Sequence, residues 1–310
     1  MKTYSLHPLL PLWLFLTLSP EANAMRTHVS NRYFQYSHRR MEKPPRMDFH
    51  LHDRFEVYIF ITGEVNYLIE KKVYPLQYGD LLIMNNRELH KPTFRSDAVY
   101  ENIVVHFDPA VADLWRNADD YEMLDCFVNR PNGEGNRIRL TSRQLDEALS
   151  ICHRAEQLSR SSLEGGGLLL TAYMTELLVL VNQAFRQQVA RPDLEAADSR
   201  PLAVHEKLAP VLDFIDRHPE RDLSLEALEG LFFMNRYYLS RLFRRATGST
   251  IHEYILLKRI ARAKKLLQEG LSVTEACQLS GFNDYSNFIR MFKRFVGMPP
   301  GQYRKREYRP

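Results

Sequence analysis

The spacing of hydrophobic residues divides this 310-residue chain into a β-rich part followed by a helical part. Between Val57 and Phe107 the apolar residues occur in short runs, separated by turn residues such as Gly63 and Gly79. We predict strands at 57–61, 65–69, 73–76, 81–84 and 99–107. Many short strands at a spacing of about ten residues are typical of a closed barrel or a jelly roll.

Helical periodicity begins at Ser142, which we expect to be an N-cap. Apolar residues then recur every three or four positions in two segments, 142–159 and 168–186, with a break at 161–167. Such a pair of amphipathic helices would either cover the barrel or form the seam of a homodimer. The pattern alone leaves both possibilities open.

The segment 191–201 combines prolines and charges without an aromatic residue, so we interpret it as a linker. An amphipathic helix is expected at 204–218, ended by Pro219. A chain of this length can hold two domains with their own cores. We therefore expect a β-barrel domain with its two helices at 25–190 and an all-α domain at 202–310, which makes the chain α+β.

A duplicated unit fills most of the second domain. Shifting the sequence by 49 residues aligns Glu226 with Glu275, Phe243 with Phe292 and Gly248 with Gly297, among eight identities. Self-similarity of this length indicates a repeated supersecondary structure. Each copy predicts a helix, a tight turn and a second helix: 225–232 then 236–246, and 273–280 then 284–295. A further helix at 251–268 joins the two copies.

The second helix of each copy has one apolar face and one polar face. With Leu239, Phe243, Phe288 and Phe292 inward, an outward face remains in each copy. The outward candidates for DNA contact are Tyr237, Ser240, Arg241 and Arg244 in the first copy, and Tyr285, Ser286, Arg290 and Lys293 in the second. Arginine can bind guanine through two hydrogen bonds, while flanking cations meet phosphates. An ordinary solvated helix face is the alternative interpretation.

Charge is distributed unevenly between the two parts. Residues 201–310 contain 19 Lys and Arg against 12 Asp and Glu, a net charge of +7, while the remainder carries −3. A basic helical domain behind a slightly acidic one favours a polyanionic partner for the second domain only. The charge pattern therefore supports DNA binding over a merely solvated face.

These helices resemble the DNA-binding domain of AraC/XylS-type transcription regulators over about 100 residues. The resemblance rests on YLSRLFRR at 238–245, the segment 260–267, Gly281-Phe282 and the closing Pro299-Pro300-Gly-Gln-Tyr303. It implies two helix-turn-helix motifs whose second helices enter consecutive major grooves of double-stranded DNA. Two residues depart from the pattern: Glu229 replaces a small alanine, and Phe233 stands where glycine is frequent.

The β-rich part carries a cluster of potential ligands. His50, His52 and Glu56, followed by Gly63, resemble the first cupin motif, and Gly79 with His90 resembles the second. In metal-binding cupins these positions hold a divalent ion, so His50, His52, Glu56 and His90 form a candidate metal set. No cofactor is required, however. The same side chains, with Tyr58 and Tyr67, could instead bind an organic effector, or the histidines could simply be satisfied by neighbouring groups.

Two classes of function remain open. We expect a cytoplasmic, homodimeric transcription activator that responds to a small molecule, most simply a sugar, and could contact RNA polymerase. The alternative is a metal-dependent cupin enzyme with an accessory DNA-binding domain. Residues 1–24 have the layout of a signal peptide, but we interpret them as an over-extended reading frame with Met25 as the start. Three scattered cysteines indicate reduced thiols, and no membrane association is expected.

Overall fold

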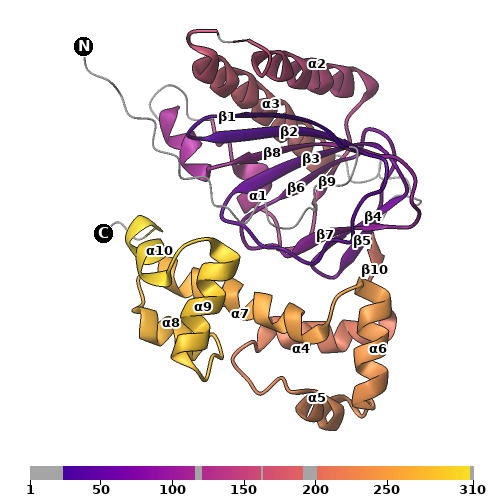
Figure 1. The fold of residues 1–310 in the computed structure, drawn as a ribbon, viewed down its shortest axis with the longest axis vertical. Helices are drawn as coiled ribbons and strands as arrows, with labels where there is room; N and C mark the ends of the chain where they lie inside the picture. The colour runs from indigo at the N-terminus through magenta and orange to yellow at the C-terminus, as the bar shows by residue number, and fades with distance from the viewer. Residues whose placement is uncertain (1–23, 116–120, 162, 191–200, 308–310) are drawn as a thin grey trace.

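The computed structural model describes residues 24–115, 121–161, 163–190 and 201–307. Within them the chain folds as an α+β protein, with a β-domain above an all-helical domain in the view of Figure 1. The expected leader-like segment and the linker fall outside these residues, apart from Ala24 and Pro201. Both expectations therefore stay predictions.

The β-domain consists of two sheets. The first has the strand order β1-β2-β8-β3-β6-β9, and the second has the order β10-β5-β4-β7. The bounds of the first sheet are β1 (Ala24–Ser30), β2 (Phe34–Met41), β3 (Phe55–Thr62), β6 (Leu81–Met84), β8 (Tyr100–Phe107) and β9 (Arg137–Ile138). Those of the second are β4 (Val65–Ile69), β5 (Lys72–Pro75), β7 (His90–Phe94) and β10 (Leu202–Ala203). The five predicted strands are confirmed within two residues at their ends, while β1, β2, β7, β9 and β10 were not predicted.

Side-chain alternation gives the first sheet two buried faces. Along β3, Tyr58 and Phe60 point into the space between the sheets, where they join Tyr67, Tyr100 and other large residues in one cluster. Val57 and Ile59 point to the opposite face and pack under helices. Because both faces are covered, β3 consists of buried residues for six positions in a row.

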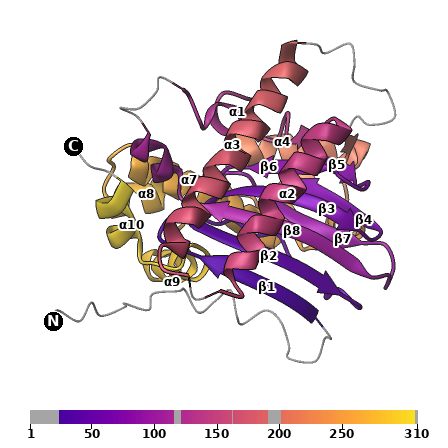
Figure 2. The same ribbon diagram turned by 90° about the horizontal axis from the view of Figure 1, so that it is seen from above.

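Two long helices cover the outer face of the first sheet, as Figures 1 and 2 show. They are α2 (Ser142–Leu158) and α3 (Gly166–Ala190), preceded by the short η2 (Pro109–Leu114) and α1 (Asp125–Val128). The N-cap of α2 is Thr141, in a capping box with Gln144, so our assignment of Ser142 as the cap was one residue late. Helix α3 is apolar and long enough to cross a membrane, but its buried residues pack on the sheet as a core helix.

The helical domain follows the predicted order. After η5 (Glu206–Leu208) come α4 (Ala209–Arg217), α5 (Leu225–Phe232), α6 (Arg236–Thr247), α7 (Ile251–Gln268), α8 (Val273–Leu279), α9 (Tyr285–Val296) and α10 (Pro300–Glu307). Asn235 and Asp284 cap α6 and α9, and Ser272 with Glu275 forms the predicted capping box of α8. The final helix, α10, was not predicted.

The repeat is not in one register throughout, contrary to the single 49-residue shift. The caps of the second helices, Asn235 and Asp284, are 49 residues apart, but the caps of the first helices, Ser224 and Ser272, are 48 apart. The difference lies in the turn. Phe233 adopts φ 51° two residues before its cap, whereas Gly281 adopts φ 86° three residues before its cap. The turn of the second copy is thus one residue longer.

The two domains share a hydrophobic core, which corrects our expectation of independent cores. Phe49, Leu51, Leu68 and Leu89 of the β-domain belong to the same buried cluster as the helices α4 to α10. The Phe49 ring packs edge-on against Tyr254 of α7, with ring centroids 5.6 Å apart. In addition, β10 pairs antiparallel with β5 and so extends the second sheet.

Candidate DNA-reading helices and ligand site

Helices α6 and α9 each present the predicted outward face. The Asn235 side chain accepts hydrogen bonds from the amides of Tyr237 and Tyr238, and Asp284 accepts one from the Asn287 amide. These caps fix where each helix starts, and the inward residues Leu239, Phe243, Phe288 and Phe292 are fully buried. The orientation of both helices therefore follows from a cap and an apolar stripe.

Seven of the eight predicted contact residues are exposed. Tyr237, Arg241 and Arg244 on α6 are open to solvent, and Ser240 between them is half-buried. On α9 the residues Tyr285, Ser286, Arg290 and Lys293 are all exposed. The Arg290 guanidinium donates a hydrogen bond of 2.9 Å to the Asn287 side chain, which restricts its position on the helix. Both faces are thus exposed to solvent while the domains are in contact.

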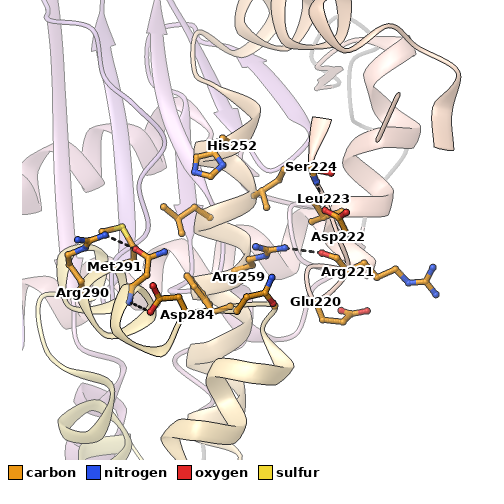
Figure 3. Close-up of a pocket in the computed structure, with 16 residues that line it drawn as sticks. Glu220, Arg221, Asp222, Leu223, Ser224, His252, Arg259, Asp284, Arg290 and Met291 are labelled. Atoms are coloured by element: carbon orange, nitrogen blue, oxygen red, sulfur yellow. Dashed lines mark hydrogen bonds between the residues drawn. The ribbon is translucent and has the colours of Figure 1, made fainter. Parts of the chain in front are cut away.

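A groove of about 720 Å³ lies between the two helix-turn-helix units, beside Arg290 (Figure 3). Arg259 of α7 crosses its floor and donates to the carbonyl oxygens of Pro219 and Arg221, at 2.8 and 2.9 Å. Three carboxylates, Glu220, Asp222 and Asp284, share the lining with three arginines, Arg221, Arg259 and Arg290. The charges balance, so an anion in the groove would meet carboxylates as well as cations.

In the β-domain, the predicted ligands come together. His50, His52, Glu56 and His90 each offer an atom, and these four atoms lie within 4.8 Å of one another. Glu56 lies on β3, and His90 begins β7 in the other sheet. A short bridge of backbone hydrogen bonds pairs His50 with His90. The cluster thus forms where the two sheets meet.

His106 completes the cluster and was missed in the sequence. It faces Glu56 directly across the β3–β8 pair, and its Nε2 lies 3.0 Å from Glu56 Oε2. The Nε2 atoms of His52 and His90 lie 2.9 and 3.3 Å from the same oxygen. The sequence places His106 on a predicted strand, but only the register between β3 and β8 shows that it lies opposite Glu56.

Burial and charge set the ionisation of this cluster. Burial alone would raise the pKa of Glu56, but His106 and His90 outweigh it and hold that pKa well below its usual range. Burial lowers the pKa of His52 to about 4, despite its hydrogen bond to Glu56. The pKa of His90 is raised, since the Glu56 carboxylate overcomes the effect of burial. Glu56 is thus an anion surrounded by imidazoles.

The two candidate tyrosines have different surroundings. Tyr67 donates a hydrogen bond of 3.4 Å to Glu56 Oε1, so it belongs to the cluster. Tyr58 instead shares a hydrogen bond of 2.9 Å with the Tyr100 hydroxyl and packs against the Tyr67 ring at an interplanar angle of 56°. Both are 2% exposed, so they fill the interior between the sheets.

Buried lysines of α7 bind the β-domain next to this cluster. Lys264 pairs with Asp53 at 2.8 Å and donates to the carbonyl oxygens of Asn86 and His52. Lys258 forms an ion pair with Glu70 and a second one with Asp216 at 3.0 Å. We had not expected these lysines to be buried, because lysines on a helix are mostly solvated. Helix α7, which joins the two DNA-reading units, is therefore bound to the loop that carries His52.

Comparison with known proteins agrees with both halves of the chain. A helix-turn-helix domain model matches residues 230–306, and the AraC-like ligand binding domain model matches residues 36–178. The chain belongs to the AraC family of transcription regulators. It is a DNA-binding regulator with a ligand-binding domain, from a family without enzymatic activity, so the cupin-enzyme alternative is set aside.

Individual relatives are similar at modest identity. The uncharacterized regulator YpdC of Escherichia coli K12 is 26% identical over 80% of this chain and 81% of its own length. The transcriptional activator RhaR of Salmonella schwarzengrund is 28% identical over 82% of this chain and 86% of its own length. Among solved structures, ToxT from Vibrio cholerae matches 89% of this chain and all of its own, with 14% identity and a TM-score of 0.36.

Proposed function

We propose that this AraC-type regulator activates transcription as a cytoplasmic homodimer when a small effector, most simply a carbohydrate, binds its β-domain. The observation that carries the proposal is the attachment of α7 to the loop of His52 through Lys264. A ligand at the histidine cluster would act on that loop and hence on the helix between the two DNA readers. The RhaR relatives are named transcriptional activators, which supports activation rather than repression.

The residue roles are part of the same proposal. We propose that Tyr237, Ser240, Arg241 and Arg244, with Tyr285, Ser286, Arg290 and Lys293, contact double-stranded DNA from α6 and α9. His50, His52, Glu56 and His90, with Tyr67 and Tyr58 behind them, line the effector site. Two copies of the chain would present four reading helices, so avidity can raise a modest affinity by orders of magnitude.

The test is a selection of genomic fragments with the purified full-length protein, with and without a panel of sugars and sugar acids. We expect enrichment of specific sites, with recovery that changes when the effector is present. The Arg290→Ala protein is expected to lose the enrichment. Arg160→Ala removes an exposed arginine that is far away in the sequence, next to α2, and serves as the control for charge. Equal enrichment by the Arg290→Ala protein would contradict the proposal.

A further inference from the structure

The histidine cluster contains five potential metal ligands rather than the four of the sequence motif. Three imidazole nitrogens, from His52, His90 and His106, lie within 3.3 Å of one carboxylate oxygen of Glu56. The fourth imidazole, His50, packs against His90 with ring centroids 4.3 Å apart. These side chains come from β3 and β8 of one sheet, from β7 of the other sheet and from the loop before β3, and the fold brings them together.

The orientation of three imidazoles is fixed from behind. His52 Nδ1 lies 2.7 Å from the Arg54 carbonyl oxygen, His90 Nδ1 lies 2.8 Å from that of Glu88, and His50 Nδ1 lies 3.3 Å from that of Asp48. A carbonyl oxygen only accepts hydrogen bonds, so each Nδ1 carries the proton. The Nε2 atoms then face the centre of the cluster. Backbone carbonyl partners of this kind are what orient metal-binding histidines.

Around Glu56 Oε2 the arrangement brings together more lone pairs than protons, since His52 and His90 both have Nδ1 bonded to a carbonyl oxygen. Glu56 Oε2 cannot donate as a carboxylate, and a neutral imidazole with its proton on Nδ1 cannot donate from Nε2. The fully buried His90 Nε2 has no hydrogen-bond partner of proper geometry. A positive ion between these nitrogen atoms and the Glu56 carboxylate would give His90 Nε2 a partner. Tyr67 meanwhile holds the other oxygen, Glu56 Oε1.

We propose that the cluster binds one divalent transition-metal ion through His52, Glu56, His90 and His106, with His50 at its outer edge. Imidazole donors suit zinc, nickel, cobalt, iron and copper, whereas magnesium and calcium prefer oxygen ligands. His50 and His106 are partly exposed while Glu56 and His90 are buried, so the ion reaches the site from the side of His50 and His106.

The inference names a ligand for the effector site and so rests on the proposed function. Oxygen atoms of a sugar or sugar acid are themselves metal ligands, so a bound ion would give the effector a point of attachment. The interior behind the cluster is filled by Tyr58, Tyr67 and Tyr100. An ion at this site would be bound by His52, whose carbonyl oxygen accepts a hydrogen bond from Lys264 of α7.

The experiment is a titration of the chelator-treated full-length protein with Co²⁺, followed by its visible absorption, and competition with Zn²⁺ and Ni²⁺. We expect one equivalent per chain, no competition by Mg²⁺, and a higher melting temperature in the presence of the ion. His90→Gln and His106→Gln should each weaken binding at least about 10-fold. His153→Gln changes an exposed histidine on α2 and should bind as the wild type does.

The His106→Gln variant is the sharpest, since His106 is partly exposed and lies outside the sequence motif. Less than about 0.2 equivalent bound by the wild type, or equal affinity in all variants, would overturn the proposal. Fragment selection on the same samples separates the two hypotheses. Specific DNA binding without metal binding refutes only the metal site, whereas stoichiometric metal binding without specific DNA binding refutes only the proposed function.

Discussion

Lys258 of α7 forms a buried ion pair with Glu70 at the end of β4, and this contact joins the DNA-binding domain to the sheet of the β-domain. The Lys258 side chain is 9% exposed and that of Glu70 is 3% exposed. Glu70 also accepts a hydrogen bond of 2.8 Å from the Leu89 amide. Asp216 of α4 adds a second carboxylate to the same lysine.

Replacing Lys258 by Met is expected to lower the free energy of unfolding by about 3–5 kcal/mol, because Glu70 is left as an unpaired buried charge. Urea unfolding measures the change. Lys265→Met, on the same helix but half-exposed, removes only a surface pair with Glu269 and should cost less than about 1 kcal/mol. The double variant Lys258→Met, Glu70→Gln should recover part of the loss. Equal effects of Lys258→Met and Lys265→Met would contradict a buried pair.

The four cationic residues among the DNA-facing residues should separate into two groups by their salt dependence. Arg241→Ala and Arg290→Ala are expected to cost about 1–3 kcal/mol at the cognate site and to relax base preference there. Arg244→Ala and Lys293→Ala should weaken all sequences alike and lower the salt slope by about one unit. Binding isotherms at several salt concentrations, on cognate and scrambled DNA, measure both effects. A uniform loss for Arg290→Ala would reassign it to a phosphate contact.

Phe233→Gly is expected to stabilise the protein. Phe233 adopts a left-handed conformation with φ 51° and is 95% exposed, so its side chain contributes little burial to offset the strain. The conformation costs a non-glycine residue about 1–2 kcal/mol, and glycine loses about 0.5–1 kcal/mol through its greater freedom in the unfolded chain. We therefore expect a net gain of about 0.5–1 kcal/mol in unfolding experiments. Phe233→Val should lose stability, and the opposite order would refute this account of the turn.

The three cysteines should be unreactive in the native protein. Burial raises the pKa of the Cys126 and Cys152 thiols to about 12, and Cys277 is also buried with a raised pKa. Since the thiolate is the reactive form, its fraction at pH 8 is on the order of one in ten thousand at a pKa near 12. A thiol reagent such as Ellman's reagent should modify all three residues in denaturant and none of them rapidly without it. A fast-reacting native thiol would show an opening near that residue.

In the helical domain, α5 to α9 could be predicted to within one residue at their ends, but α4 begins five residues later than predicted and α10 was missed. The bounds predicted for α5 and α7 match the structure, because a cap residue and an apolar stripe both depend on residues close together in the sequence. The β-domain was less accessible. The strands β1 and β2 contain arginines and histidines among few apolar residues, so they lack a strong alternation. Strand β2 is held between β1 and β8 by pairing on both sides.

The candidate ligand site could be predicted only in part. His50, His52, Glu56 and His90 follow a linear motif, but His106 joins them through the register of β3 and β8. The buried lysines of α7 were equally hidden. Lys258 and Lys264 acquire their partners from residues almost 190 and more than 200 positions earlier in the chain. No local pattern distinguishes them from solvated lysines, because their burial depends on how the two domains meet.

Helix α7 also determines what kind of DNA site one chain can recognise. Its 18 residues span about 27 Å, and a helix-turn-helix unit is attached at each end without a long connection. In the proposed function, the length of α7 sets the number of base pairs between the two grooves that one chain reads. An effector that acts through α7 would turn or release both readers together. It could change how two chains share an operator, but not the internal spacing of each half-site.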